Sequence, residues 1–228
     1  MIRAILFDLD GVVIDSEPLY EAVEKQLFEQ YGISMPEGDQ KIFKGTTEIR
    51  FYDLVEEMYH PDWDRQQVMR EGRKLLLDLF ARELRFVPGF LSLMDRLHGR
   101  YLTGLVTSTP RYLLEEVRDL LPVETYFPEM ICADDISAGK PHPEPYLTMM
   151  KRLSVSPAET VVIEDSLHGI TSATASGAVC VALATSFSRE ELQQADKVVG
   201  SLDEIDEGFV DALSEQRSPP DPNGPGES

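Results

Sequence analysis

The sequence predicts an α/β protein, a doubly wound parallel-sheet core of the Rossmann-like type with an inserted helical cap domain. Residues 2–9 are a near-continuous apolar run that ends in Asp8-Leu9-Asp10-Gly11, which is typical of a strand buried on both faces. Similar apolar runs alternate with helical patterns further along the chain, as in a right-handed parallel sheet. Between them, residues 16–85 carry helical patterns without a convincing buried strand.

The remaining elements of the core follow from the same signals. Residues 102–107 form a second apolar run, and Pro110 then begins a helical pattern, a position that proline favours. Residues 160–164 predict a third strand that ends in acidic residues. The other expected elements are strands over 130–133 and 179–184 and helices over 90–98 and 169–176.

Two interruptions in the pattern set the expected domain boundaries. The α/β catalytic core is assigned to residues 1–15 and 86–216, and the helical cap to residues 16–85. The turn Val87-Pro88-Gly89 returns the chain to the core. Residues 217–228 are rich in proline and glycine, so we expect this tail to be disordered.

The net charge of −20 narrows the possible partners. So acidic a protein repels nucleic acid and anionic membranes, and we expect neither as a partner. The same field repels a phosphorylated metabolite, so a phosphate site needs local positive potential from a metal, a lysine or helix N-termini. We expect a monomer or a weak homodimer.

The two cysteines, Cys132 and Cys180, lie in short apolar stretches and match no metal or disulfide spacing. Buried free thiols are therefore expected, and a reducing cytoplasm is the natural compartment. The N-terminal apolar segment meets acidic residues at Asp8, too early for a signal peptide. No apolar run is long enough for a transmembrane helix.

Polar side chains follow three of the expected strands. Ligands of doubly wound sheets bind at the carboxyl ends of the strands, so these side chains are expected to converge at one edge. Taken singly, each is a common helix cap, turn or surface residue; their joint placement favours a functional site. They are Asp8 and Asp10, then Thr107 and Ser108, then Glu164 and Asp165, with Lys140 arriving from a loop.

These residue types suit phosphate chemistry. Neighbouring carboxylates resist ionisation unless a cation joins them, and Mg²⁺ with oxygen ligands suits Asp8 and Asp165. The ion would let anionic Asp8 attack an anionic phosphate. Thr107, with Ser108 beside it, would bind phosphoryl oxygens, and Lys140 would supply a fixed positive charge.

Residues 7–18 (FDLDGVVIDSEP), Thr107, Lys140 and Glu164-Asp165 resemble, in order, the four motifs of the haloacid dehalogenase (HAD) superfamily, in its branch with a helical cap after the first motif. The resemblance implies a phosphoaspartyl intermediate on Asp8, with Asp10 as general acid and base. It also implies that Asp10 binds Mg²⁺ through its backbone carbonyl. Whether Glu164 ligates the metal or orients its waters stays open.

The cap loop Lys44-Gly45-Thr46-Thr47 resembles the loop that approaches the phosphate in sugar-phosphate members, which makes Lys44 a candidate substrate contact. Lys44 alone is as readily explained as a solvated surface lysine. Where β-phosphoglucomutases have an arginine, this chain has Glu48, an argument against mutase activity, although Arg50 could compensate.

The expected function is Mg²⁺-dependent hydrolysis of a small phosphorylated metabolite, with sugar phosphates favoured. The first alternative is a β-phosphoglucomutase-like phosphomutase, which shares the catalytic residues. Dehalogenation is disfavoured because Asp10 has no role with a halide leaving group. A receiver-like phosphoacceptor is disfavoured because receivers lack a helical insertion after the first strand, here residues 16–85.

Overall fold

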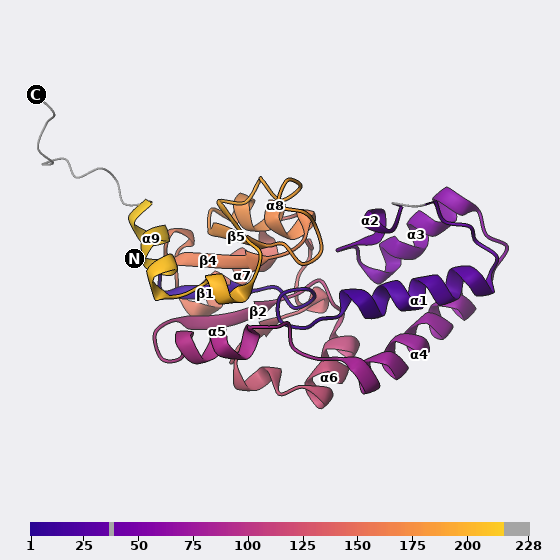
Figure 1. The fold of residues 1–228 in the computed structure, drawn as a ribbon, viewed down its shortest axis with the longest axis horizontal. Coiled ribbons are helices and arrows are strands. Elements are labelled where there is room, and N and C mark those ends of the chain that lie inside the picture. The colour runs from indigo at the N-terminus through magenta and orange to yellow at the C-terminus, as the bar shows by residue number, and fades with distance from the viewer. Residues whose placement is uncertain (37–38, 217–228) are drawn as a thin grey trace, which may run out of the picture.

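The computed structural model describes residues 1–36 and 39–216, so the predicted disordered tail lies outside the described residues. Within them the chain forms a six-stranded sheet in the order β3-β2-β1-β4-β5-β6, in which every neighbouring pair is parallel (Figure 1). The strands are β1 (Ala4–Phe7), β2 (Leu102–Val106), β3 (Glu129–Ile131), β4 (Thr160–Glu164), β5 (Val179–Leu183) and β6 (Lys197–Val199). The predicted doubly wound α/β core is confirmed, with β6 as a strand that the sequence did not signal.

The order of strands creates a switch point at β1. The chain builds β2 and β3 on one side of β1 and then returns to build β4, β5 and β6 on the other. In a doubly wound sheet the crevice at such a point, beyond the carboxyl ends of the strands, is where ligands bind. The residues that follow β1, β2 and β4 therefore meet at one edge.

Helices cover both faces of the sheet and extend past its carboxyl edge. On one face α5 and α6 pack with Ile5 and Phe7 of β1, and on the other α7 and α8 pack with Ala4 and Leu6. This alternation explains why the whole of β1 is apolar, because both faces of the strand are buried. The helices are α1 (Glu17–Gln30), α2 (Gln40–Phe43), α3 (Glu48–Tyr59), α4 (Arg65–Glu83), α5 (Phe90–Leu97), α6 (Arg111–Leu120), α7 (Glu144–Leu153), α8 (Leu167–Ser176) and α9 (Glu207–Gln216), with 3₁₀ turns at Val123–Thr125, Ala133–Asp135, Pro157–Glu159 and Leu202–Glu204.

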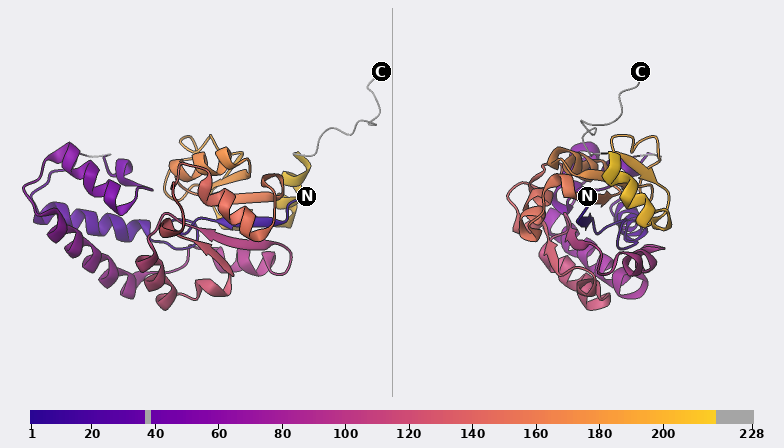
Figure 2. Two further views of the ribbon diagram at one scale, coloured as in Figure 1. Left: turned by 180° about the vertical axis from the view of Figure 1, so that it is seen from behind. Right: turned by 90° about the vertical axis from the view of Figure 1, so that its left-hand side faces the viewer.

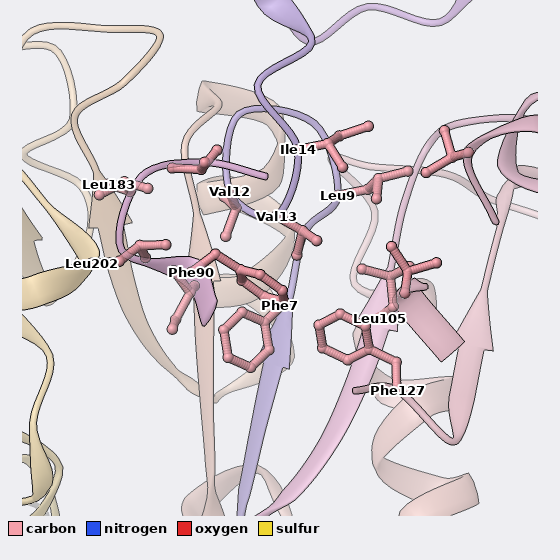
Figure 3. Close-up of a cluster of buried hydrophobic side chains, with 14 of the residues drawn as sticks. Phe7, Leu9, Val12, Val13, Ile14, Phe90, Leu105, Phe127, Leu183 and Leu202 are labelled. Atoms are coloured by element: carbon pink, nitrogen blue, oxygen red, sulfur yellow. The ribbon is translucent and has the colours of Figure 1, made fainter. Parts of the chain in front are cut away.

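Three aromatic side chains pack together at the end of β1. Phe7 lies with its ring centroid 6.3 Å from that of Phe90 and 5.4 Å from that of Phe127. All three side chains are fully buried, and Val12 and Val13 close the group from the turn that follows the strand (Figure 3). Burying such large rings contributes roughly 2 kcal/mol each. Asp8 follows Phe7 directly, so this packing holds the backbone from which the Asp8 side chain extends.

The helices α1 to α4, here called the cap helices, lie beyond the carboxyl edge of the sheet (Figures 1 and 2). The two segments that join them to the sheet run side by side: the Asp15 N–H donates to the Arg85 carbonyl at 2.9 Å, and the Val87 N–H donates to the Val13 carbonyl at 3.0 Å. Arg85 also forms an ion pair with Asp15 at 2.7 Å. The predicted helical content of residues 16–85 agrees with these elements; the domain boundaries at 15/16 and 85/86 stay a prediction.

Gly169, in the first turn of α8, makes room for Glu164. A Cβ at Gly169 would lie 1.8 Å from Glu164 Oε1, and Glu164 is fully buried. We expect Gly169→Ala to lower the free energy of unfolding by about 2 kcal/mol or more, as overpacking does. Gly208→Ala is the matched control, because Gly208 is an exposed glycine within α9 and should gain about 0.5 kcal/mol as alanine. Urea denaturation measures both, and equal midpoints for the two variants would contradict this account.

Candidate active site

A cavity between the carboxyl edge of the sheet and the cap helices brings the predicted site residues together. It is lined by side chains from the ends of β1, β2 and β4, from the lysine loop and from the cap loop. All seven predicted site residues line it: Asp8, Asp10, Lys44, Thr107, Ser108, Lys140 and Asp165. The predicted convergence is therefore a property of the structure, while the role of each residue stays a prediction.

Lys140 is the central cation of this site. Its Nζ donates to Asp8 Oδ1 at 2.5 Å, to the Val106 carbonyl at 2.9 Å and to Glu164 Oε1 at 2.7 Å. An ammonium group has three N–H donors, so the set is complete. Burial alone would lower the pKa of Lys140, but the carboxylates of Asp8 and Glu164 raise it above its usual value. Lys140 is thus a fixed positive charge that ties three strand ends together.

Glu164 serves Lys140 from beneath the cavity. Its Oε1 also accepts from the Tyr146 hydroxyl at 2.7 Å, and its Oε2 accepts from the Asp165 N–H at 3.1 Å and the Ser166 hydroxyl at 3.1 Å. Both oxygens of this fully buried carboxylate are therefore engaged by protein donors. This arrangement fits a role for Glu164 in positioning Lys140. It bears on whether Glu164 also ligates the metal directly, which the sequence left open.

Asp10 is held by two hydroxyl groups. Ser16 Oγ donates to Asp10 Oδ1 at 2.6 Å, and Thr109 Oγ1 donates to Asp10 Oδ2 at 2.6 Å. Thr107 Oγ1 in turn donates to Thr109 Oγ1 at 2.9 Å. The hydroxyl expected to bind phosphate therefore belongs to the same hydrogen-bond chain as the expected general acid.

Asp8 and Asp165 create an excess of negative charge that a cation would balance. Burial, opposed by Lys140, raises the pKa of Asp8 to about 8. Burial and the charge of Asp8 likewise raise the pKa of Asp165 far above its usual range. Carboxylate oxygens of Asp8, Glu164 and Asp165 lie within 4.8 Å of one another. Oxygen donors at this spacing fit a hard divalent cation.

Two neighbours fix the position of Asp165. The Ser186 hydroxyl donates to Asp165 Oδ2. Gly11 has a positive φ of 71°, and a Cβ there would lie 2.0 Å from that same oxygen. The glycine after Asp10 is therefore needed for both the turn and the space.

The cap side of the cavity carries ion pairs. Lys44 Nζ lies 3.0 Å from Glu21 and 4.0 Å from Glu17. Arg73 of α4 contacts Glu48 through Nε at 2.6 Å and Nη2 at 2.7 Å. The suggestion that Arg50 could compensate for Glu48 gains no support, because Arg50 pairs with exposed Glu57 at 3.1 Å and neither lines the cavity.

Sequence reasoning missed several residues that hold the site. Ser16 lies within the quoted first motif, and Thr109 follows Ser108 directly, so both could have been suspected from proximity. Tyr146 and Ser186 have no local signal, because each meets its carboxylate only through the fold. Arg73 lies within a helix pattern that also contains other basic residues.

Comparison with known proteins defines the class of the chain, a hydrolase of α/β fold. The chain belongs to the haloacid dehalogenase-like hydrolase family, whose sequence profile matches residues 5–183. The resemblance found in the four motifs is therefore confirmed.

Individual relatives agree with this family. The chain is 32% identical over 177 residues to a phosphorylated carbohydrates phosphatase of Thermotoga maritima, covering 77% of this chain and 82% of the relative. It is 32% identical over 207 residues to a validoxylamine A 7'-phosphate phosphatase of Streptomyces hygroscopicus subsp. limoneus, covering 90% and 96%. A solved β-phosphoglucomutase of Clostridium difficile superposes with a TM-score of 0.80 at 22% identity, covering 95% of this chain and 98% of that one, which shows the common fold.

No helix within residues 1–36 and 39–216 is both long and apolar enough to cross a bilayer.

The raised pKa values predict a coupling between pH and metal binding. The pKa of the Asp8 carboxyl is raised from 3.8 to about 8 in the folded protein. Its contribution to the free energy of unfolding is therefore fully present below pH 3.8 and is lost as the pH rises through about 8. A cation that binds the ionised carboxylates offsets the loss, so MgCl₂ should raise the melting temperature of EDTA-treated protein more at pH 8 than at pH 6.

Differential scanning calorimetry at both pH values measures this increment. Asp165→Asn removes one carboxylate from the cluster and should reduce the increment at pH 8. Equal increments at the two pH values would contradict the assignment of the cluster as a cation site.

Proposed function

We propose that this protein is a Mg²⁺-dependent phosphatase that hydrolyses a small phosphorylated metabolite, most favourably a sugar phosphate, through a phosphoaspartyl intermediate on Asp8. The observation that carries the proposal is the contact of 2.5 Å between Lys140 Nζ and Asp8 Oδ1 in a cavity that also contains Asp10, Thr107 and Asp165. Membership of the hydrolase family and relatives named as phosphatases support the enzyme class, phosphoric monoester hydrolase.

The phosphate group would bind next to the cationic groups of the site. Asp8, Asp165 and the Asp10 backbone carbonyl would hold Mg²⁺, which when bound lowers the repulsion between the carboxylate and the phosphate. Lys140 shields Asp8 Oδ1, which leaves Oδ2 as the attacking atom. Thr107 and Ser108 line the cavity and donate hydroxyl hydrogen bonds to phosphoryl oxygens, and Lys44 contacts the substrate from the cap side.

The reaction then proceeds in two displacements at phosphorus. Asp8 Oδ2 forms a bond to phosphorus as the ester P–O bond breaks, and the protonated carboxyl of Asp10 gives its proton to the leaving alcohol oxygen. Asp10, now a carboxylate, takes a proton from water, whose oxygen attacks the phosphoaspartate and releases inorganic phosphate. Asp8 is regenerated, and Asp10 again carries a proton. Ser16 and Thr109 keep Asp10 in place through both steps.

The proposed setting is the cytoplasm. Both cysteines, Cys132 and Cys180, are buried and unpaired in the structure, as expected in a reducing compartment. The net charge of −20 argues against nucleic acid and anionic membranes as partners.

Removal of the nucleophile should abolish turnover while the fold is kept. Asp8→Asn should reduce p-nitrophenyl phosphate hydrolysis to background, and Asp10→Asn should reduce kcat by about 10²–10⁴-fold, the usual contribution of a general acid. Asp119→Asn, which changes an exposed aspartate of α6, is the matched control and should keep wild-type activity. Appreciable turnover by pure Asp8→Asn protein would remove the proposed mechanism.

A substrate screen tests the preference among phosphate esters. With Mg²⁺ present, phosphate release from hexose and hexitol phosphates should exceed release from phosphoglycolate and nucleotides. Activity should disappear in EDTA and return poorly with Ca²⁺, which prefers a larger and looser coordination shell. A requirement for a catalytic sugar bisphosphate, with isomerised sugar phosphate as product, would identify a phosphomutase in place of a phosphatase.

A further inference from the structure

On the cap side of the cavity, Arg73 is already paired with a glutamate. Arg73 donates from Nε and Nη2 to the two oxygens of Glu48 at 2.6 and 2.7 Å. Both residues line the cavity that also contains Asp8. This two-point geometry is the one with which arginine binds a phosphate group. Glu48 therefore fills the position that a second phosphate of a substrate would take on Arg73.

A third residue holds this ion pair from the core. The Tyr112 hydroxyl of α6 donates to Glu48 Oε2 at 3.3 Å, and the Arg73 guanidinium lies 5.0 Å from the centroid of the Tyr112 ring. Glu48 comes from α3 and Arg73 from α4. The pair is thus fixed from three helices, which limits its freedom to open for an incoming anion.

The rest of the cap side is rich in carboxyl groups. Glu17, Glu21 and Glu24 of α1 line the cavity, and Lys44 pairs with the first two of them. Burial, reinforced by the charges of Glu17 and Glu21, raises the pKa of Glu24 to about 8. Burial likewise raises the pKa of Glu17 to about 7, so at neutral pH Glu24 is mostly protonated and Glu17 partly so. Both described cations on the cap side, Lys44 and Arg73, are already paired with glutamates. A second anionic group therefore has no free cation to bind there, whereas carboxyl groups readily form hydrogen bonds with hydroxyl groups.

We infer that the cavity selects phosphomonoesters whose far end carries hydroxyl groups and no second anionic group, and that Glu48 determines this selection by occupying Arg73. The inference rests on the proposed function, since it names the class of ester that the same site accepts. Sugar and polyol monophosphates belong to the favoured class, and sugar bisphosphates to the excluded one.

The test compares two substrates that differ only by the second phosphate. The kcat/KM values for fructose 1-phosphate and fructose 1,6-bisphosphate are measured with Mg²⁺ present, and the wild type should favour the monophosphate by about tenfold or more. Glu48→Gln keeps the shape of the side chain, removes its charge and releases Arg73. The ratio of the two kcat/KM values should then move toward the bisphosphate by about tenfold, the effect of one charge-assisted hydrogen bond.

Two further variants distinguish the effect of releasing Arg73 from the effect of removing a negative charge in general. Glu57→Gln removes a carboxylate from the same helix, α3, where Glu57 pairs with Arg50 and does not line the cavity; its ratio should equal that of the wild type. Glu48→Gln combined with Arg73→Gln should cancel the gain. Circular dichroism melting curves confirm that each variant is folded.

The outcomes are distinct for the two proposals. If the wild type hydrolyses monophosphates but Glu48→Gln leaves the ratio unchanged, the inference about Glu48 is overturned and the proposed function stands. A wild-type preference for the bisphosphate, or a gain that persists in the double variant, overturns it equally. Absence of hydrolysis for every phosphate ester overturns both proposals.

Discussion

The site depends on one ammonium group placed between two buried carboxylates. Lys140 Nζ donates to Asp8 and Glu164, and also to the Val106 carbonyl at 2.9 Å. Without that cation, two carboxylates would face each other in a medium where burial alone disfavours their charge. Because its three partners lie at the carboxyl ends of β1, β2 and β4, Lys140 also links the site to the three central strands. The fold and the reactive group are therefore stabilised by the same contact.

Much of the core was predictable because its signals are local. Apolar runs such as residues 160–164 gave the strands, and the rule that ligands bind at strand ends brought Asp8, Lys140 and Asp165 to one edge. The short strand β6 escaped prediction, because three residues between loop segments carry too little pattern. The sequence has Glu48 where β-phosphoglucomutases have an arginine and offers Arg50 as a compensating residue, but it carries no sign that Glu48 pairs with Arg73. Arg73 lies on a different helix, and only the packing of α3 against α4 reveals the pair.

The two ends of the cavity have different roles in the proposed enzyme. The sheet edge supplies the charges proposed to act on a phosphate group, and partners such as buried Tyr146 and partly buried Ser186 hold those charges in place. The cap side supplies ion pairs whose members are partly exposed, such as Glu48 with Arg73. A change at the first end disturbs buried charges, which is costly, whereas a change at the second alters contacts near solvent. The same reaction can therefore be kept while the accepted ester differs.

The paired connections between Asp15 and Arg85 and between Val13 and Val87 show how the cap helices are attached to the sheet. The chain leaves the sheet and returns to it at nearly one point, so the intervening helices resemble a module set on a short double stem. Lengthening, shortening or exchanging that module leaves strand order and register untouched. Under the proposed function, a change in the accepted phosphate ester can therefore be confined to one continuous stretch of the chain.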